Sequence, residues 1–230
     1  FIRTLENTGR RYIYLTNNSS RAGVDYVNRL RGLGFPCEME NVFTSGMATG
    51  MYLMEKYPGV PVYPVGTPAF LDELRSYGVP FAEGDDAGVV CVGFDTTLEY
   101  NRLAKACDFI RAGLPAYGLN PDLNCPTETG FIPDCGSIAK LIEGSTGRTF
   151  PFFGKPSPLT RAYIAKHTGL SESEIAVVGD RLYTDIALAD NSPMCSILVL
   201  SGESKAGDIG TMPGTPDLVF RDLSEIIPYL

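Results

Sequence analysis

The chain has 230 residues, of which 44% are hydrophobic and 20% charged, an ordinary balance for a globular protein. This length exceeds the common size of one domain, so we expect two compact units or one unit with a large insertion. Twenty-seven acidic and nineteen basic residues give a net charge of −8, which argues against nucleic acid or an anionic membrane as a partner. No apolar run approaches the ~18 residues of a membrane span, and the first residues lack the pattern of a signal peptide.

The six cysteines include no Cys-x-x-Cys pair, and His167 is the only histidine. This pattern argues against a zinc site, and the scattered thiols predict a protein of the reducing cytoplasm. His167 lies near the end of a predicted helix, just before Gly169, where a cation suits the helix dipole. A structural role is therefore predicted for it.

The first elements in chain order are the end of a helix over residues 1–9, a strand over residues 11–15 and a helix that begins near residue 22. The tip between strand and helix reads Thr16-Asn-Asn-Ser-Ser20. Hydroxyls and free amides at a helix N-terminus can hold a phosphate, although a well-capped loop has the same composition. A further helix over residues 45–56 carries three methionines on one face, and these are expected in the core.

The pattern changes after residue 58. Strands are predicted at residues 61–65, 89–92 and 115–120, and they alternate with helices. Thr67-Pro68 supplies an N-cap and a first-turn proline for the first of these helices, and a capping box, Thr96-x-x-Glu99, is expected to open the second.

The rest of this region is a loop rich in proline and glycine over residues 125–136, followed by a helix over residues 137–142. Alternating strands and helices predict a separate small α/β unit, which we place at residues 59–150. Residues 1–58 and 151–230 are then expected to form the main domain.

The main sheet is expected to resume with a short aromatic strand at residues 150–153, which is followed by Lys155 between a glycine and a proline. Such a rigid loop orients the ammonium group of Lys155, whereas an ordinary surface lysine usually lies in a more flexible segment. The next elements are a helix over residues 159–166 and strands at residues 196–200 and 218–220.

Between them, the uncharged run at residues 175–178 predicts a parallel strand that is buried on both faces and ends at Gly179. Asp180 and Asp185 follow at its C-terminal tip, which is the side of an open α/β sheet that binds ligands. Two carboxylates there form an oxygen-rich site of the kind that Mg²⁺ prefers. The alternative is that both aspartates only form the turn and cap the next helix.

Taken together, three of these tips resemble motifs of the haloacid dehalogenase (HAD) superfamily of phosphatases. The sequences Leu15-Thr-Asn-Asn-Ser-Ser20, Gly154-Lys-Pro-Ser-Pro158 and Gly179-Asp-x-x-x-Thr-Asp185 look like its second, third and fourth motifs. The order and spacing are similar to the NagD, nitrophenyl phosphatase and phosphoglycolate phosphatase branch, which has a large inserted cap. The resemblance covers the whole chain and implies a doubly wound parallel α/β sheet, a HAD-like Rossmannoid core, with an inserted α/β cap.

The resemblance also implies the role of each motif residue. Thr16 and Asn17 would bind phosphate, Lys155 would hold phosphate and nucleophile together, and Asp180 would bind Mg²⁺, with Asp185 acting directly or through water. In the cap, Asp95, Asn120 and Asp122 would face the leaving group. The implied substrate is a small phosphorylated metabolite, no nucleic acid or membrane partner is expected, and a homodimer is left open.

The chain departs from the family in one respect. The first motif, Asp-x-Asp-Gly, whose first aspartate attacks phosphorus, is absent from residues 1–230. Asp85-Asp-Ala-Gly88 lies inside the predicted cap and cannot replace it. Two hypotheses follow: a segment before Phe1 carries the motif, in which case a break is expected in the sheet beside residues 11–15 and 175–178, or the nucleophile is lost naturally.

The first hypothesis makes the protein a Mg²⁺-dependent phosphatase that forms an aspartyl-phosphate, and it is the one we favour. The second makes it a regulatory protein that binds phosphate and metal on the same fold. A nucleotide-cofactor protein is a third reading, but the sequence has neither Gly-x-Gly-x-x-Gly nor Gly-x-x-x-x-Gly-Lys-Ser/Thr.

Overall fold

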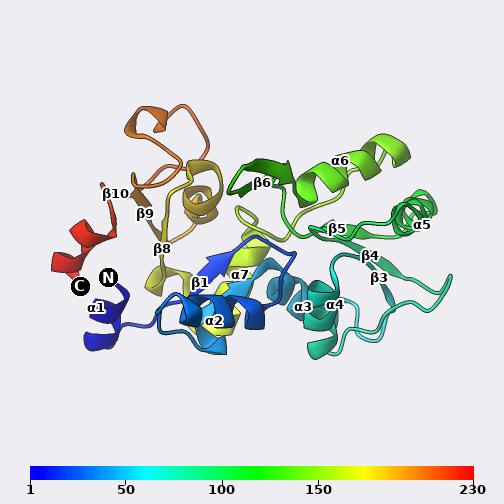
Figure 1. Ribbon diagram of the computed structural model, residues 1–230, viewed down its shortest axis with the longest axis horizontal. Coiled ribbons are helices and arrows are strands. Elements are labelled where there is room, and N and C mark those ends of the chain that lie inside the picture. The colour runs from blue at the N-terminus through cyan, green and yellow to red at the C-terminus, as the bar shows by residue number, and fades with distance from the viewer. The chain divides into compact units, whose positions relative to one another are not determined.

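The computed structural model describes residues 1–230 and divides into two compact units. The first unit consists of Phe1–Tyr14, Gly34–Pro36 and Lys155–Leu230, and the second of Leu15–Leu33 and Cys37–Gly154. Figure 1 labels the helices and strands of both units.

The first unit contains a three-stranded parallel sheet in the order β10-β9-β8. Its strands are β8 (Ala176–Gly179), β9 (Cys195–Val199) and β10 (Leu218–Phe220), and its helices are α1 (Ile2–Asn7) and α7 (Pro158–Thr168). The rest of the unit includes one π-helical turn, Leu182–Ile186, and short 3-10 turns at Glu172–Glu174, Ala187–Ala189, Ala206–Asp208 and Leu223–Tyr229.

The second unit contains a three-stranded parallel sheet of β3 (Val62–Val65), β4 (Val89–Val92) and β5 (Ala116–Gly118), in that order. Helix α5 (Tyr100–Arg111) packs on β3 and β4, and α6 (Cys135–Thr146) packs on β4 and β5. The second unit also holds the larger hydrophobic core, which includes the fully buried side chains of Leu53, Phe70, Leu74, Ile110, Leu119 and Ile142.

The remaining elements of the second unit precede or flank this sheet. They are α2 (Gly23–Gly32), the 3-10 turn Met39–Asn41, β2 (Val42–Thr44), α3 (Ser45–Lys56) and α4 (Pro68–Ser76). Strand β2 pairs with β1 (Tyr14–Thr16), which spans the boundary between the two units.

Several helices begin and end as the local sequence predicts. Thr67 caps α4 by accepting a hydrogen bond from the amide of Phe70, and Pro68 occupies the first turn. Helix α7 is capped by Ser157 and ends at Gly169, whose φ of 67° is a left-handed conformation that glycine adopts without strain. His167 lies in the last turn of α7, as predicted.

The α/β class with parallel sheets is confirmed, and β8, β9 and β10 lie within one residue of the predicted strands. Helix α3 has the predicted bounds. Its methionine stripe is only partly in the core, because Met47 is buried whereas the side chain of Met54 is exposed.

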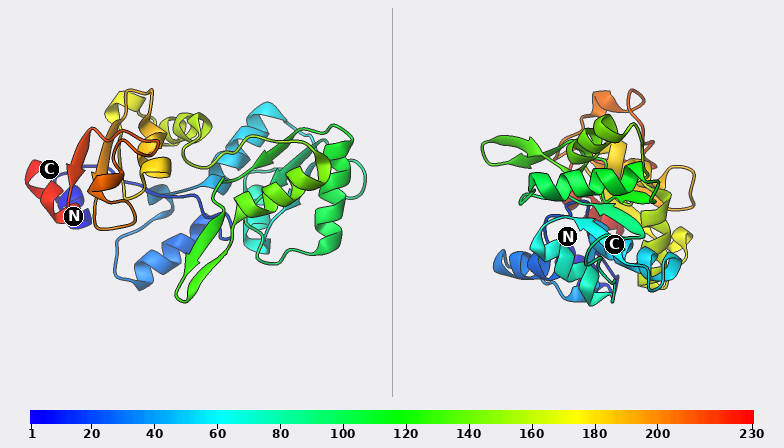
Figure 2. Two further views of the ribbon diagram at one scale, coloured as in Figure 1. Left: turned by 90° about the horizontal axis from the view of Figure 1, so that it is seen from above. Right: turned by 90° about the vertical axis from the view of Figure 1, so that its right-hand side faces the viewer.

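The predicted loop at residues 125–136 is wrong in part, because most of it forms an antiparallel hairpin of β6 (Asn124–Thr127) and β7 (Gly130–Pro133). Figure 2 shows the hairpin standing away from the body of its unit. The prolines that suggested a loop, Pro126 and Pro133, are tolerated because neither strand lies inside a larger sheet.

The prediction that residues 175–178 are buried on both faces is also wrong. Strand β8 lies at the edge of its sheet, and Val178 keeps 36% of its surface exposed. An edge strand has a strand neighbour on one side only, which leaves more of it exposed. Strand β1 pairs with β2 in a sheet separate from that of β8, and the expected break in a sheet that contains both strands stays a prediction.

Two local predictions fail for identifiable reasons. The capping box at Thr96 does not form: the N-cap of α5 is Glu99, and Asp95 instead draws residue 97 into a turn by accepting its amide and hydroxyl hydrogens. The aromatic segment near residue 152 does not resume the main sheet, because Phe152 makes a single parallel bridge to Gly118 of β5.

The predicted domain boundaries differ from the boundaries of the two units. Residues 15–33 and 37–58 were assigned to the main domain, yet they group with residues 59–154 in the second unit. The contacts between α3 and α4 and the hydrogen bonds described below account for this grouping. A cap limited to residues 59–150 stays a prediction.

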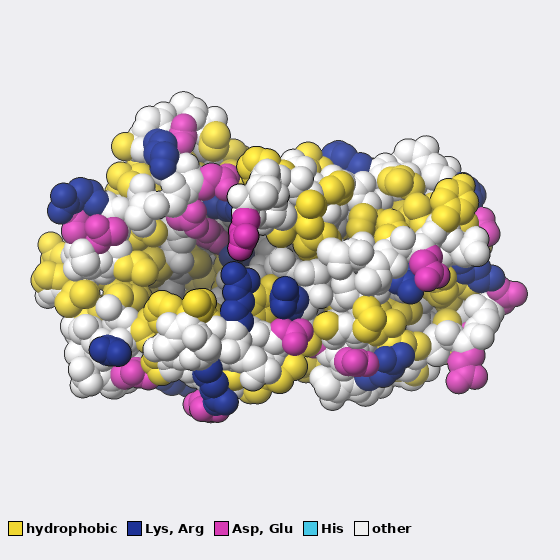
Figure 3. All heavy atoms as spheres, viewed as in Figure 1, with side chains coloured by type: hydrophobic (Ala, Val, Ile, Leu, Met, Phe, Trp, Pro, Cys, Tyr) yellow, Lys and Arg dark blue, Asp and Glu magenta, His cyan; other side chains and the backbone are white.

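None of the helices is both long and apolar enough to cross a bilayer. On the face drawn in Figure 3, basic and acidic side chains are interspersed.

Candidate active site

The predicted site residues form two groups, one in each unit. Lys155, Asp180 and Asp185 belong to the first unit and are called the acidic site here. The other predicted residues, Thr16, Asn17, Asp95, Asn120 and Asp122, belong to the second unit.

Lys155 and Asp185 form an ion pair in the acidic site. The lysine Nζ donates to Asp185 Oδ1 at 2.6 Å, and the two side chains are only 11% and 12% exposed. Lys155 follows the end of the second unit and precedes Ser157, which caps α7. A carboxylate at this distance and depth fixes the direction of the ammonium group.

Asp185 is held from a second side. Its Oδ2 accepts the amide hydrogen of Arg181 at 3.2 Å, within the turn that follows β8. Gly179 makes this approach possible, because a Cβ built on it would lie 2.2 Å from the Cβ of Asp185. Both carboxylate oxygens of Asp185 therefore have protein donors.

Asp180 lies at the C-terminal end of β8, where the motif predicts it. Its Oδ2 accepts the amide hydrogen of Glu203 at 2.8 Å, and its backbone oxygen accepts the amide hydrogen of Ser204 at 3.0 Å. The hydrogen bonds that involve its carboxylate use Oδ2, so Oδ1 is the oxygen best suited to a further ligand.

The donor set of the acidic site fits Mg²⁺ better than a metal that needs an all-protein cage. No group of three or more His, Cys, Asp or Glu residues is placed to hold a metal ion. Mg²⁺ usually binds through one or two carboxylates and keeps several waters and substrate phosphates as its other ligands. Asp180 can supply a direct carboxylate, whereas Asp185, with both oxygens occupied, suits a contact through water.

The loop that carries Thr16 and Asn17 is shaped by its own polar groups. The Thr16 hydroxyl accepts the amide hydrogen of Asn18 at 3.2 Å, and the Asn18 side chain accepts both the amide and the hydroxyl hydrogens of Ser20. The backbone oxygen of Asn17 accepts the hydroxyl hydrogen of Ser45 at 2.9 Å. These bonds hold the loop in a turn before α2.

The same loop is tied to a set of polar side chains called the amide network here. Its members are Asn17, Ser19, Asn120, Asp122 and Asp134. Asn17 and Asn120 both donate to Asp122 Oδ2, at 2.9 and 3.0 Å, and Asn120 also donates to Asp134 Oδ1 at 3.0 Å. Two predicted residues, Asn120 and Asp122, thus contact the predicted phosphate loop.

Ser19 completes the amide network. Its hydroxyl accepts the amide hydrogen of Phe94 at 2.9 Å and donates to Asn120 Oδ1 at 3.2 Å, and both Ser19 and Asn120 are fully buried. No buried side-chain nitrogen or oxygen of the protein lacks a hydrogen-bond partner. A network in which every member is satisfied rigidifies the elements that it joins.

Asp95 has a different setting from the one predicted. Its side chain is fully buried and pairs with Arg102 at 2.7 Å, while its other oxygen accepts two hydrogens from Thr97. Arg102 also donates to the backbone oxygen of Gly66. These contacts favour a structural role for Asp95 over contact with a leaving group.

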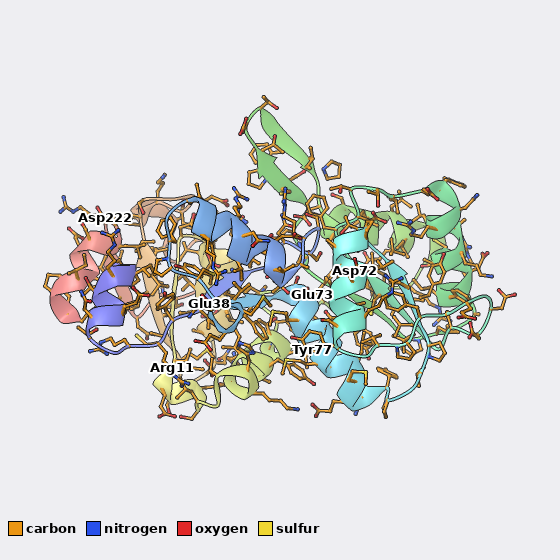
Figure 4. All side chains as sticks on the ribbon, turned by 60° about the horizontal axis from the view of Figure 1, so that its bottom comes forward. Arg11, Glu38, Asp72, Glu73, Tyr77 and Asp222 are labelled. Atoms are coloured by element: carbon orange, nitrogen blue, oxygen red, sulfur yellow. The ribbon has the colours of Figure 1, made fainter.

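Sequence reasoning missed several residues that shape the two groups. Ser19 was seen only as part of a polar loop, and Glu73 and Glu203 were not singled out. Glu73, labelled in Figure 4, projects from α4 and accepts the amide hydrogen of Gly23 at 2.6 Å and the hydroxyl hydrogen of Thr44 at 2.9 Å. Burial raises the pKa of Glu73 above its ordinary value. A lone glutamate in an amphipathic helix gives no local signal of such a position.

Comparison with known proteins agrees with this geometry. The family described as haloacid dehalogenase-like hydrolase matches residues 1–80, and the HAD-hydrolase-like family matches residues 152–226. An acid sugar phosphatase of Staphylococcus aureus is 34% identical over the whole chain, which covers 89% of that relative. The 5'-nucleotidase YutF of Bacillus subtilis is 33% identical, again over the whole chain and 90% of its own length.

Solved structures give the same result. A 4-nitrophenylphosphatase from Thermotoga maritima is 38% identical with a TM-score of 0.91, over 98% of this chain and 87% of that one. A p-nitrophenyl phosphatase from Archaeoglobus fulgidus is 27% identical with a TM-score of 0.92, over 100% and 90%. The chain belongs to the haloacid dehalogenase-like hydrolases, in their NagD-like branch. It is a phosphoric monoester hydrolase of that family, so the resemblance inferred from the motifs is confirmed.

Proposed function

We propose that the protein hydrolyses small phosphomonoesters with the help of Mg²⁺ and through an aspartyl-phosphate. The observation that supports this most is the buried pair of Lys155 and Asp185 beside Asp180 at the end of β8. Phosphoryl transfer needs positioning and neutralisation of oxygen charge more than elaborate covalent chemistry. One ammonium group and two carboxylates at a strand end meet that need.

Each residue has a defined task in this proposal. Asp180 and, through water, Asp185 would hold Mg²⁺, which when bound neutralises phosphate oxygens. The ammonium of Lys155 neutralises a phosphate oxygen and the attacking carboxylate. The Thr16 hydroxyl and the Asn17 amide donate hydrogen bonds to the phosphate, as the family motif implies. Asn120 and Asp122 act on this loop through the amide network.

The covalent steps need a carboxylate that residues 1–230 do not supply from an Asp-x-Asp-Gly motif. We assign it to the family's first motif, on a segment before Phe1. Its oxygen forms a bond to phosphorus while the ester bond breaks, and the second aspartate of that motif protonates the leaving oxygen. Water then attacks phosphorus and releases inorganic phosphate with the carboxylate restored.

The names of the relatives indicate a class of substrates and not a single compound. Their names cover a sugar phosphatase, a 5'-nucleotidase and nitrophenyl phosphatases, which act on chemically different leaving groups. We infer a small phosphomonoester whose leaving group is a sugar or a nucleoside. We also place the protein in the cytoplasm, since all six cysteines are free thiols, and a homodimer stays a prediction.

The proposal is tested with the protein as its gene encodes it. Phosphate release from p-nitrophenyl phosphate, sugar phosphates and nucleoside 5'-monophosphates is measured in Mg²⁺ and in EDTA. We expect turnover in Mg²⁺, loss of turnover in EDTA, and a phosphorylated protein after acid quench that hydroxylamine cleaves. Lys155→Met should abolish both signals, whereas Lys140→Met, on the exposed side of α6, should not. Equal rates in EDTA and Mg²⁺ would refute the proposal.

A further inference from the structure

The loop after β9 lies against Asp180. The amide of Glu203 donates to Asp180 Oδ2 at 2.8 Å, and the amide of Ser204 donates to the backbone oxygen of Asp180 at 3.0 Å. Two consecutive amides of one loop thus hold both the side chain and the main chain of the aspartate. All of these residues belong to the first unit.

The loop is itself anchored by the residues that follow Asp180. The Ser204 hydroxyl, in a side chain that is only 3% exposed, accepts the amide hydrogen of Leu182 at 3.1 Å. The Glu203 carboxylate pairs with Arg181 Nε at 2.8 Å and accepts the hydroxyl hydrogen of Tyr183 at 2.5 Å. The loop after β9 and the segment that begins at Asp180 therefore each donate hydrogen bonds to the other.

Gly202 leaves the space that the Asp180 carboxylate occupies. A Cβ built on Gly202 would lie 2.0 Å from Asp180 Oδ2 and 2.4 Å from its Cγ, which no real Cβ tolerates. The φ of Gly202 is not in the left-handed region, so close approach rather than backbone freedom requires a glycine here.

We propose that the Gly202–Glu203–Ser204 loop is a positioning element for the cation ligand, in that it binds Oδ2 of Asp180 and so directs Oδ1 toward the divalent cation. The inference rests on the proposed function in taking Asp180 as that ligand. Glu203 does not compete for the cation, because Arg181 and Tyr183 already bind both of its oxygens. Groups that orient a metal ligand typically contribute about 10–100-fold in metal affinity.

The test compares Gly202→Ala with Gly207→Ala. Gly207 lies in the same connection, is exposed, has no positive φ, and a Cβ there would meet nothing within 4 Å. Binding of Mn²⁺ is measured from the electron paramagnetic resonance signal of the free ion without substrate. The Mg²⁺ concentration that gives half-maximal phosphatase activity is measured alongside, and circular dichroism confirms the fold.

We expect Gly202→Ala to weaken Mn²⁺ binding by about 10–100-fold and to raise the Mg²⁺ requirement similarly, with most of kcat recovered at saturating Mg²⁺. Gly207→Ala should behave as the wild type. A wild-type affinity in Gly202→Ala would overturn the inference and leave the proposed function intact. A wild type that neither binds Mn²⁺ nor depends on Mg²⁺ would overturn both.

A second variant covers the case in which Gly202→Ala does not fold. Glu203→Ala removes the carboxylate that Arg181 and Tyr183 hold but keeps the amide that binds Asp180, so the loop loses part of its anchor without a steric clash. We expect a smaller loss of Mn²⁺ affinity than in Gly202→Ala. An unchanged affinity in a folded Glu203→Ala protein, where Gly202→Ala is unfolded, would overturn the inference.

Discussion

The acidic site and the amide network reach a fixed geometry by different means. In the acidic site, formal charges lie near the end of one strand, and backbone amides from neighbouring loops orient them. In the amide network, side chains from three separate segments bind one another, and most of them are buried.

This difference divides the residues into those expected to act in catalysis and those expected to stabilise the fold. Charged groups next to a strand end can attract a phosphate and a cation, and their removal should affect activity first. Donors and acceptors that bind one another in a mostly buried network stabilise the loop that they surround, and their removal should affect the free energy of unfolding first. Substitutions in each region can test this division, and the largest effects are expected in the acidic site.

Asp180→Asn should give the largest loss. An amide oxygen replaces a formal charge on a hard cation, and we expect kcat to fall by about 100–1000-fold in the protein as its gene encodes it, equivalent to a few kcal/mol of barrier. The amide of Glu203 still has an oxygen to bind, so the unfolding midpoint should change little. Steady-state rates with Mg²⁺ and thermal unfolding measure the two effects. Asp190→Asn, in the same unit, should keep the wild-type rate.

Asp185→Asn should have a mixed effect. The side chain keeps its shape but leaves the buried ammonium of Lys155 without a counter-charge, which should cost about 2–4 kcal/mol in stability and about 10–100-fold in activity. The pair is tested by a double-mutant cycle with Lys155→Met, monitored by urea unfolding. The combined loss should be smaller than the sum of the single losses, and strict additivity would show that the two side chains do not interact.

The placement of the two aspartates of the acidic site could be predicted from the sequence because both are close to one strand end. Asp180 and Asp185 follow the same strand, and Gly179 marks where that strand ends. The position of Lys155 was predicted from a stiff loop and a family motif.

The amide network could not be predicted because its partners are far apart in the chain. Ser19 binds Asn120 and the amide of Phe94, and no periodicity or motif relates these three positions. Asp95 was predicted to face the leaving group, and the sequence does not reveal that Arg102, in the first turn of the next helix, pairs with its carboxylate. Likewise, β8 was expected to be buried on both faces, whereas in residues 1–230 it lies at the edge of its sheet.

Ser19→Ala tests the predicted role of the amide network in stability. It leaves the buried amide of Phe94 and the buried oxygen of Asn120 without this partner, so we expect a loss of about 1–3 kcal/mol in the free energy of unfolding. The Mg²⁺ requirement of the folded protein should be unchanged. Ser173→Ala, at an exposed hydroxyl, is the matched control and should lose little. A changed Mg²⁺ requirement with unchanged stability would contradict the division.

The smallest effect is a dependence of stability on pH that comes from Glu73, the buried carboxyl group between α4 and the starts of α2 and α3. Burial raises its pKa in the folded protein above the ordinary value of 4.5, although the hydrogen bonds from Gly23 and Thr44 oppose the shift. The unfolded chain therefore releases this proton at a lower pH than the folded chain does. The contribution of Glu73 to stability is complete below pH 4.5 and is lost as the pH rises through the folded-state pKa.

Glu73→Gln isolates this contribution, because an amide cannot titrate. Urea unfolding of wild type and variant from pH 4 to pH 8 should show that the variant gains stability relative to the wild type as the pH rises. Exposed carboxyl groups such as that of Asp217, whose pKa is lowered by hydrogen bonds from Ser196, give the opposite slope in both proteins and cancel in the difference. Glu128→Gln, at the exposed turn of the hairpin, should show no such difference. A difference that is constant with pH would mean that Glu73 titrates alike in the folded and unfolded chains.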